Sequence, residues 1–159
     1  MKVTPPGSRP AKPINYFEDL AEGMKLDLGT IQLEESDIIA FAREYDPQPF
    51  HLGETETLIA SGWQIGAMGM RLLCEGLLLG SGSMVSPGIE EMRWFSAVHA
   101  GDLLCGHAVV DQLRYSNSKP DVGIVSLSIG LEGADGQLVM RSRQNVFWKR
   151  NMGETTQSR

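Results

Sequence analysis

An acidic residue and a histidine lie five positions apart in the stretch DPQPFH, which runs from Asp46 to His51. A carboxylate and an imidazole held side by side can share one water molecule, one group removing a proton while the other donates one, and such acid–base work typically contributes about 10²–10⁴ in rate. Pro47 and Pro49 fix their own backbone torsions and push the residues before them away from helical geometry. The segment is therefore predicted to be a rigid arch that holds the two side chains in place.

The spacing of these residues also fits a plainer interpretation. Asp and Pro are ordinary turn residues, so Asp46 could cap the turn while His51 is a partly buried structural side chain. The motifs elsewhere in the chain must separate a turn from a catalytic pair.

The elements on either side of the arch follow from the hydrophobic pattern. Residues 25–33, KLDLGTIQL, alternate as a strand does, and Ser36 is expected to cap a short helix over residues 37–45 that ends before Pro47. Residues 57–80 are apolar nearly all round, which predicts a long buried helix.

Beyond residue 88 the hydrophobic pattern has a period of two. It predicts four strands, over residues 89–98, 102–116, 122–132 and 137–150, and their short connections imply antiparallel neighbours. The chain is therefore expected to be an α+β fold in which an antiparallel β-sheet wraps around a long central helix. Edge strands of such a sheet are usually covered, so a homodimer with a continuous sheet, or an oligomer built from such dimers, is expected.

The apolar helix could in principle span a membrane, but its sequence favours a soluble setting. Arg71 and Glu75 interrupt it at i, i+4 spacing, where they can pair. Gly62, Gly66 and Gly69 repeat on one side, which would let the helix lie close to a sheet. No membrane partner is therefore expected.

Length and composition fit one domain, because 159 residues with 42% hydrophobic content suffice for one core. Residues 14–150 are expected to form it, between a flexible N-terminal tail, residues 1–13, and a polar C-terminal tail, residues 151–159.

The net charge of −6 and the lack of a Lys or Arg run argue against nucleic acid as a partner. Residues 1–13 lack the apolar segment of a secretory signal, and Cys74 and Cys105 are expected to be buried reduced thiols, so a cytoplasmic location is expected.

The motif and its surroundings resemble the MaoC-like dehydratases, a hot-dog-fold family that includes the (R)-specific enoyl-CoA hydratases. The family signature is an acidic residue, a spacer, Asn or Gln, Pro, a hydrophobic residue and His, which Asp46 to His51 matches. Three further stretches are similar to the family. Residues 16–24, YFEDLAEGM, resemble its first strand region, and residues 58–63, LIASGW, resemble the start of its central helix. Residues 92–104, MRWFSAVHAGDLL, resemble one of its strand pairs. The resemblance covers most of residues 16–149.

The resemblance implies a lyase that reversibly adds water to an enoyl-CoA to give an (R)-3-hydroxyacyl-CoA. Asp46 would be the base, His51 would orient the water and deliver the proton at C2, and Gly62 and Gln48 would contact the substrate. Free N–H groups at a helix N-terminus suit the negative charge that develops on the thioester oxygen, although Gly62 could equally serve helix packing.

No cofactor is implied, since coenzyme A would arrive as part of the acyl-CoA substrate. The three histidines lack the close spacing of a zinc site and no Cys-x-x-Cys occurs, so no metal is expected. The phosphates of coenzyme A would need surface cations, and the sequence offers Arg93, Arg114, Lys119, Arg141 and Arg143.

Two departures from the family pattern keep alternatives open. Residues 51–62, HLGETETLIASG, are several residues shorter than the family's segment, which helps to form the acyl pocket. Ser96 and Ala97 stand where a basic residue and proline are common, and His99 is added; His99 and His107 are expected to be surface or strand residues. A non-catalytic subunit that binds acyl thioesters, or a thioesterase that directs its water at the carbonyl carbon, are the alternative functions.

Overall fold

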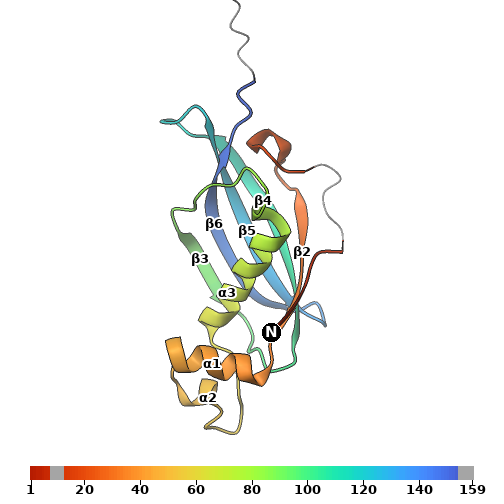
Figure 1. Ribbon diagram of the computed structural model, residues 1–159, viewed down its shortest axis with the longest axis vertical. Coiled ribbons are helices and arrows are strands. Elements are labelled where there is room, and N and C mark those ends of the chain that lie inside the picture. The colour runs from red at the N-terminus through yellow and green to blue at the C-terminus, as the bar shows by residue number, and fades with distance from the viewer. Residues whose placement is uncertain (8–12, 154–159) are drawn as a thin grey trace, which may run out of the picture.

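Figure 1 shows the computed structural model, which describes residues 1–7 and 13–153. One antiparallel sheet of six strands has the order β1-β2-β4-β5-β6-β3. Its strands are β1 (Lys2–Thr4), β2 (Lys25–Gln32), β3 (Ile89–Trp94), β4 (Leu103–Tyr115), β5 (Val122–Gly133) and β6 (Leu138–Lys149).

The helices lie on one side and at one end of this sheet. Helix α3 (Gly62–Leu73) crosses one face of the sheet, and α1 (Glu35–Tyr45) and α2 (Pro49–Leu52) lie beside its N-terminal end (Figure 1). A short 3-10 helix, Phe17–Asp19, and a π-helix, Cys74–Leu78, complete the elements. An antiparallel sheet curved around one long helix is the α+β hot-dog arrangement predicted from the sequence.

The core lies between α3 and the sheet. Ile65, Met68 and Leu72 of α3 are almost completely buried, and Trp148 of β6 is fully buried. A Cβ atom on Gly69 would lie 2.7 Å from the terminal methyl of Met140, so the helix lies close to β6 at this glycine. The glycine side of the helix therefore faces the sheet, as expected.

The pairing of β3 differs from the prediction. β4–β5 and β5–β6 are antiparallel neighbours as expected, whereas β3 pairs with β6 at the edge of the sheet and not with β4. The connection after β3 is held across the end of the sheet, because Phe95 N donates to Val139 O at 2.8 Å and Val98 O accepts from Ala60 N at 2.8 Å. A short connection thus joins strands that are not neighbours.

The central helix is shorter than the 57–80 expected from the sequence. Residues 57–60 precede it and are not helical, since Ile59 N donates to Phe50 O at 3.1 Å and Ala60 N donates to Val98 O at 2.8 Å. The α-helix ends at Leu73 and continues as the π-helix Cys74–Leu78. Arg71 and Glu75 pair as expected, with 2.6 Å between Arg71 Nε and Glu75 Oε1.

Two further boundaries differ from the sequence-based expectation. The N-cap of α1 is Glu34 and not Ser36, because the Asp37 carboxylate accepts a hydrogen bond from Glu34 N at 2.9 Å. Lys2–Thr4, expected within a flexible tail, form β1 and pair with β2. Residues 8–12 and 154–159, which belong to the two expected tails, lie outside the described residues.

None of the helices in the described part of the chain is both long and apolar enough to cross a membrane.

Candidate active site

The DPQPFH arch is a sharp turn between two helices. Helix α1 ends at Tyr45, and its C-cap Asp46 has φ −150° and ψ 67°. Helix α2 begins after Gln48, which has φ −91° and ψ 143°. Both residues before the prolines are thus outside helical geometry, as predicted. Gln48 N donates to Asp46 O at 2.8 Å and His51 N donates to Gln48 O at 2.9 Å, so backbone bonds close the turn on both sides.

The turn brings Asp46 and His51 together. His51 Nε2 lies 3.4 Å from Asp46 Oδ2, and the imidazole is 5% exposed. Its other nitrogen, Nδ1, lies 2.7 Å from Ile59 O. Because a carbonyl oxygen only accepts hydrogen bonds, Nδ1 carries a proton, and the ring is held with Nε2 directed at the carboxylate.

Two further side chains hold the Asp46 carboxylate. Ser61 Oγ donates to Oδ2 at 2.6 Å, and Gln48 Nε2 donates to Oδ1 at 2.7 Å. These hydrogen bonds from Ser61 and Gln48, together with the nearby His51, hold the pKa of Asp46 below its usual value. Asp46 is therefore a carboxylate at neutral pH, with each oxygen fixed in direction.

Ser61 also begins the central helix. It is the N-cap of α3, and its hydroxyl accepts a hydrogen bond from Trp63 N at 3.2 Å. Gly62 follows as the first helical residue, where an N–H has no acceptor within the helix and the helix dipole is positive. The carboxylate and the helix N-terminus are thus joined through one hydroxyl.

Gly62 also serves close packing. A Cβ atom at this position would lie 2.9 Å from the indole ring of Trp94, and Trp94 meets Trp63 edge to face at 5.7 Å. Gly62 can serve both roles, because Trp94 packs where a Cβ atom would be, whereas the substrate would bind the backbone N–H.

Ser61 is a site residue that the sequence reasoning missed. Serine directly before Gly62 is a strong N-cap signal, and it would have placed the helix start correctly. Its bond to Asp46 has no local signal, because the two residues are fifteen positions apart. Gln48, expected at the substrate, directs its amide to Asp46, and its contact with substrate stays a prediction.

The other candidate residues lie apart from this group. His99 is exposed and His107 is half-buried, and each has a carboxylate partner of its own, Asp102 at 3.6 Å and Glu132 at 3.7 Å. Cys74 and Cys105 are free thiols that are only partly buried. In residues 1–7 and 13–153, no group of three or more His, Cys, Asp or Glu side chains is placed to hold a metal ion.

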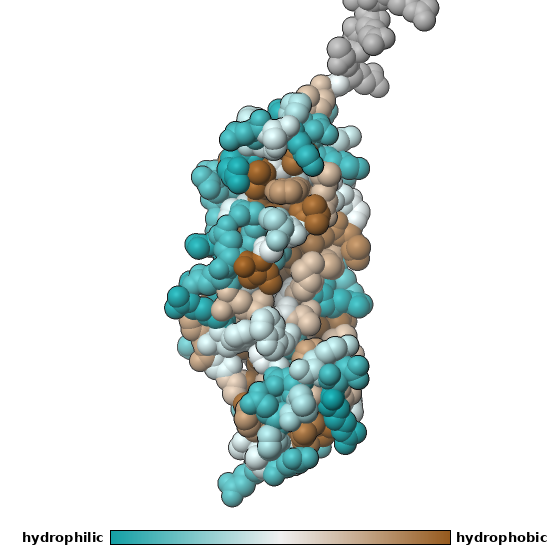
Figure 2. All heavy atoms as spheres, turned by 90° about the vertical axis from the view of Figure 1, so that its left-hand side faces the viewer, coloured by the Kyte–Doolittle hydropathy of each residue, from teal (hydrophilic) through white to brown (hydrophobic). Residues whose placement is uncertain are grey.

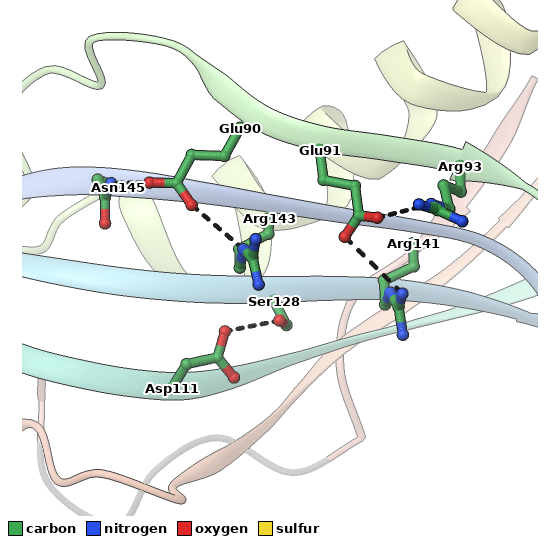
Figure 3. Close-up of polar contacts among 8 residues, drawn as sticks. All are labelled: Glu90, Glu91, Arg93, Asp111, Ser128, Arg141, Arg143 and Asn145. Carbon is green, nitrogen blue, oxygen red and sulfur yellow. Dashed lines mark hydrogen bonds and ion pairs between the residues drawn. The ribbon is translucent and has the colours of Figure 1, made fainter.

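Three of the five candidate cations already have partners on the outer face of the sheet. Figure 3 shows Glu91 between Arg93 and Arg141. Glu91 Oε1 lies 2.6 Å from Arg93 Nε, and Glu91 Oε2 lies 3.8 Å from Arg141 Nη2. Arg143 pairs with Glu90 at 3.2 Å, and Glu90 also accepts from Asn145. These arginines belong to the solvated face of the sheet.

Comparison with known proteins supports the fold and the family resemblance. No family model matches the chain. A solved MaoC-like dehydratase from Rhodospirillum rubrum is 34% identical, with a TM-score of 0.78 over 85% of this chain and 97% of that one. The curated protein YdeM of Bacillus subtilis, described as uncharacterised, is 23% identical over 141 residues, which is 84% of this chain and 99% of the relative.

Two solved R-hydratases share the fold at lower identity. The enzyme from Pseudomonas aeruginosa is 20% identical, with a TM-score of 0.68 over 85% of this chain and 86% of that one. The (R)-hydratase from A. caviae, described as involved in PHA biosynthesis, is 23% identical, with a TM-score of 0.61 over 81% of this chain and 97% of that one.

Proposed function

The chain belongs to the MaoC-like dehydratase family, and on this premise we propose that it reversibly hydrates an enoyl-CoA to an (R)-3-hydroxyacyl-CoA. The observation that carries the proposal is the fixed Asp46–His51 pair next to the N-terminus of α3. A water molecule in contact with both side chains would meet a carboxylate held by Ser61 and a ring held by Ile59 O.

The proposed reaction begins with Asp46 ionised and His51 protonated. The Asp46 carboxylate takes a proton from water as the water oxygen forms a bond to C3, and the electron pair of the double bond moves toward the thioester carbonyl. His51 Nε2 then gives its proton to C2. Proton transfer from Asp46 to His51 over their 3.4 Å separation restores both groups, so the net change is addition of one water.

The thioester oxygen gains negative charge during this step. In the proposed mechanism it accepts a hydrogen bond from Gly62 N–H, and the positive end of the helix dipole stabilises it further. Asp46 and His51 act from the same side of the substrate, so the hydroxyl and the proton add to one face of the double bond. Coenzyme A would enter only as part of the substrate.

A homodimer formed along β3 is part of this proposal. β3 is an edge strand, and Ile89 and Trp94 on it are 52% and 40% exposed. Met70 and Trp63 on the neighbouring helix are 45% and 65% exposed, and Figure 2 shows apolar surface among the hydrophilic atoms on this side of the molecule. Pairing of two β3 strands would cover this surface and extend the sheet across both copies.

The test is loss of the enoyl-thioester absorbance with short, branched and medium-chain trans-2-enoyl-CoAs, followed by chiral analysis of the product. Turnover to the (R)-3-hydroxyacyl-CoA is the expected result. Release of free thiol without hydration would indicate a thioesterase. Binding of acyl-CoA without either reaction would overturn the proposed activity and favour a non-catalytic binding subunit.

A further inference from the structure

A small cavity lies between α3, β3 and the inner face of the sheet, beyond the candidate active site, and two of its wall residues, Met70 and Ile89, are 45% and 52% exposed. Its volume is about 30 Å³, which is enough for roughly one water-sized group. Apolar side chains such as Met70, Leu73 and Ile129 form most of its wall. Ser142 and Gln144 of β6 form the rest.

These two polar side chains are unusual for the inner face of the sheet. Ser142 and Gln144 are each 6% exposed, whereas their inward neighbours on β6, Met140 and Val146, are apolar. Neither side chain forms a hydrogen bond within residues 1–7 and 13–153, and their polar atoms are not fully shut off from solvent. A chain that enters the cavity and displaces this solvent would leave the hydroxyl and the amide unpaired unless it carried a polar atom of its own.

The cavity lies along the same side of α3 as Gly62. Gly66 and Gly69, which line the cavity, follow Gly62 by four and seven residues, so at 1.5 Å per residue the cavity lies about 6 to 10 Å further along the helix. An extended chain advances about 1.3 Å per bond. Atoms about five to eight bonds from a thioester carbonyl carbon held at Gly62 would therefore reach it.

Met92 lies in the cavity wall next to Gly66. A Cβ atom on Gly66 would lie 3.1 Å from both Sδ and Cε of Met92, so the end of this side chain rests on the glycine. A methionine has three rotatable side-chain bonds and adapts to irregular spaces, so Met92 can turn aside for an acyl chain.

The charge of the surroundings restricts what the cavity can accept. None of its described wall residues is charged. Arg141 and Arg143, on either side of Ser142 in the strand, point to the outer face of the sheet and pair with Glu91 and Glu90 (Figure 3). A carboxylate in the cavity would be buried without a cation, which is costly, whereas a neutral oxygen would be satisfied by Ser142 and Gln144.

We infer that the preferred acyl group carries a neutral oxygen, a hydroxyl or a keto group, at about carbon 5 to 8, where Ser142 and Gln144 bind it. This inference rests on the proposed function, because the thioester is placed at Gly62. The small volume further implies that the chain ends within one or two atoms of that oxygen.

The experiment compares trans-2-enoyl-CoAs that carry a hydroxyl on carbon 5, 6, 7 or 8 with alkyl chains of the same number of non-hydrogen atoms. The wild type should prefer the best hydroxylated substrate by at least about tenfold in kcat/KM, because its buried polar groups stay unpaired with an alkyl chain. The double variant Ser142→Ala/Gln144→Leu should reverse the preference. The control Ser126→Ala/Asn145→Leu makes similar changes on the outer face and should leave the ratio unchanged.

The inference is overturned if the wild type has an equal or higher kcat/KM with the alkyl chains and the double variant has the same ratio. In that case Ser142 and Gln144 bind an ordered water. Failure of the proposed function has a different signature, namely no hydration of any substrate. In that case titration calorimetry with the matched saturated acyl-CoAs decides. At least tenfold tighter binding of a hydroxylated chain, lost in the double variant, supports the inference, and equal Kd values overturn it.

Discussion

Ser61 donates a 2.6 Å hydrogen bond to Asp46, although fifteen positions separate the two residues in the sequence. The same hydroxyl accepts from Trp63 N at 3.2 Å and begins the central helix. The proposed base and the proposed binding site for the thioester oxygen are therefore fixed relative to each other by one serine.

Replacing Asp46 by asparagine tests the proposed base. Asp46→Asn keeps the shape of the side chain but removes its ability to accept a proton, so hydration should fall by at least about 10²-fold in kcat/KM. The rate of absorbance loss with an enoyl-CoA measures the effect.

A matched control for this change lies on the outer face of the sheet, where Asp111 accepts a hydrogen bond from Ser128. Asp111→Asn should retain wild-type activity. If Asp46→Asn also stays near the wild-type rate while thermal unfolding shows it folded, Asp46 is a turn residue and the proposed mechanism is wrong.

Removing the Ser61 hydroxyl should raise the pKa of Asp46. The hydrogen bond from Ser61 is the largest cause of the lowered pKa, so the acidic limb of the pH–rate profile should move to higher pH in Ser61→Ala. Loss of the N-cap should also lower the free energy of unfolding by about 1 kcal/mol. An acidic limb that does not move would show that Ser61 acts on the helix alone.

The lowered pKa of Asp46 also predicts a dependence of stability on pH. Since the unfolded value is near 3.8 and the folded value lies below it, ionised Asp46 stabilises the fold above pH 3.8, and this contribution is lost as the pH falls through the folded value. The difference in free energy of unfolding between the wild type and Asp46→Asn should therefore shrink below pH 3.8. Denaturant titrations at a series of pH values measure it.

Two glycines of α3 should respond differently to alanine. In Gly62→Ala the new methyl group would meet the rigid ring of Trp94 at 2.9 Å, so the free energy of unfolding should fall by about 1–3 kcal/mol. In Gly66→Ala the neighbour is the flexible end of Met92 at 3.1 Å, and helix propensity favours alanine by about 1 kcal/mol. Thermal unfolding should show a clear loss for the first variant and little or none for the second.

The dimer proposal predicts that a charge on the edge strand separates the copies. Ile89→Lys places an ammonium group on the exposed apolar side of β3 and should give a monomer in analytical ultracentrifugation. Met152→Lys changes another exposed apolar residue, after the last strand, and should leave the assembly unchanged. A dimer of unchanged affinity in Ile89→Lys would place the interface elsewhere.

Much of the fold could be predicted from local pattern. The alternation of apolar and polar residues predicted strands over 102–116 and 122–132, and the structure has β4 at Leu103–Tyr115 and β5 at Val122–Gly133. Alternating burial in a strand leaves a direct signal in the sequence. The arch was predictable for a similar reason, since proline restricts its own backbone and that of the residue before it.

Features that depend on distant partners could not be predicted in this way. Residues 57–60 are as apolar as the helix after them, but Ile59 N and Ala60 N donate to Phe50 O and Val98 O instead of joining a helix. β1 is three residues long and becomes a strand only because β2 offers it an edge. The bond between Ser61 and Asp46 is of the same kind.

The hydroxyl of Ser61 has a consequence for the segment 52–60, which lies within the stretch 51–62 that is expected to be shorter than in the family. Because Ser61 itself ties the end of this segment to Asp46, the segment's length does not set the geometry of the site. Glu54, Thr55 and Glu56 are exposed, so residues inserted there would extend outward from the site. This loop is where protein engineers could add residues beside the proposed site without rebuilding the Asp46–His51 pair.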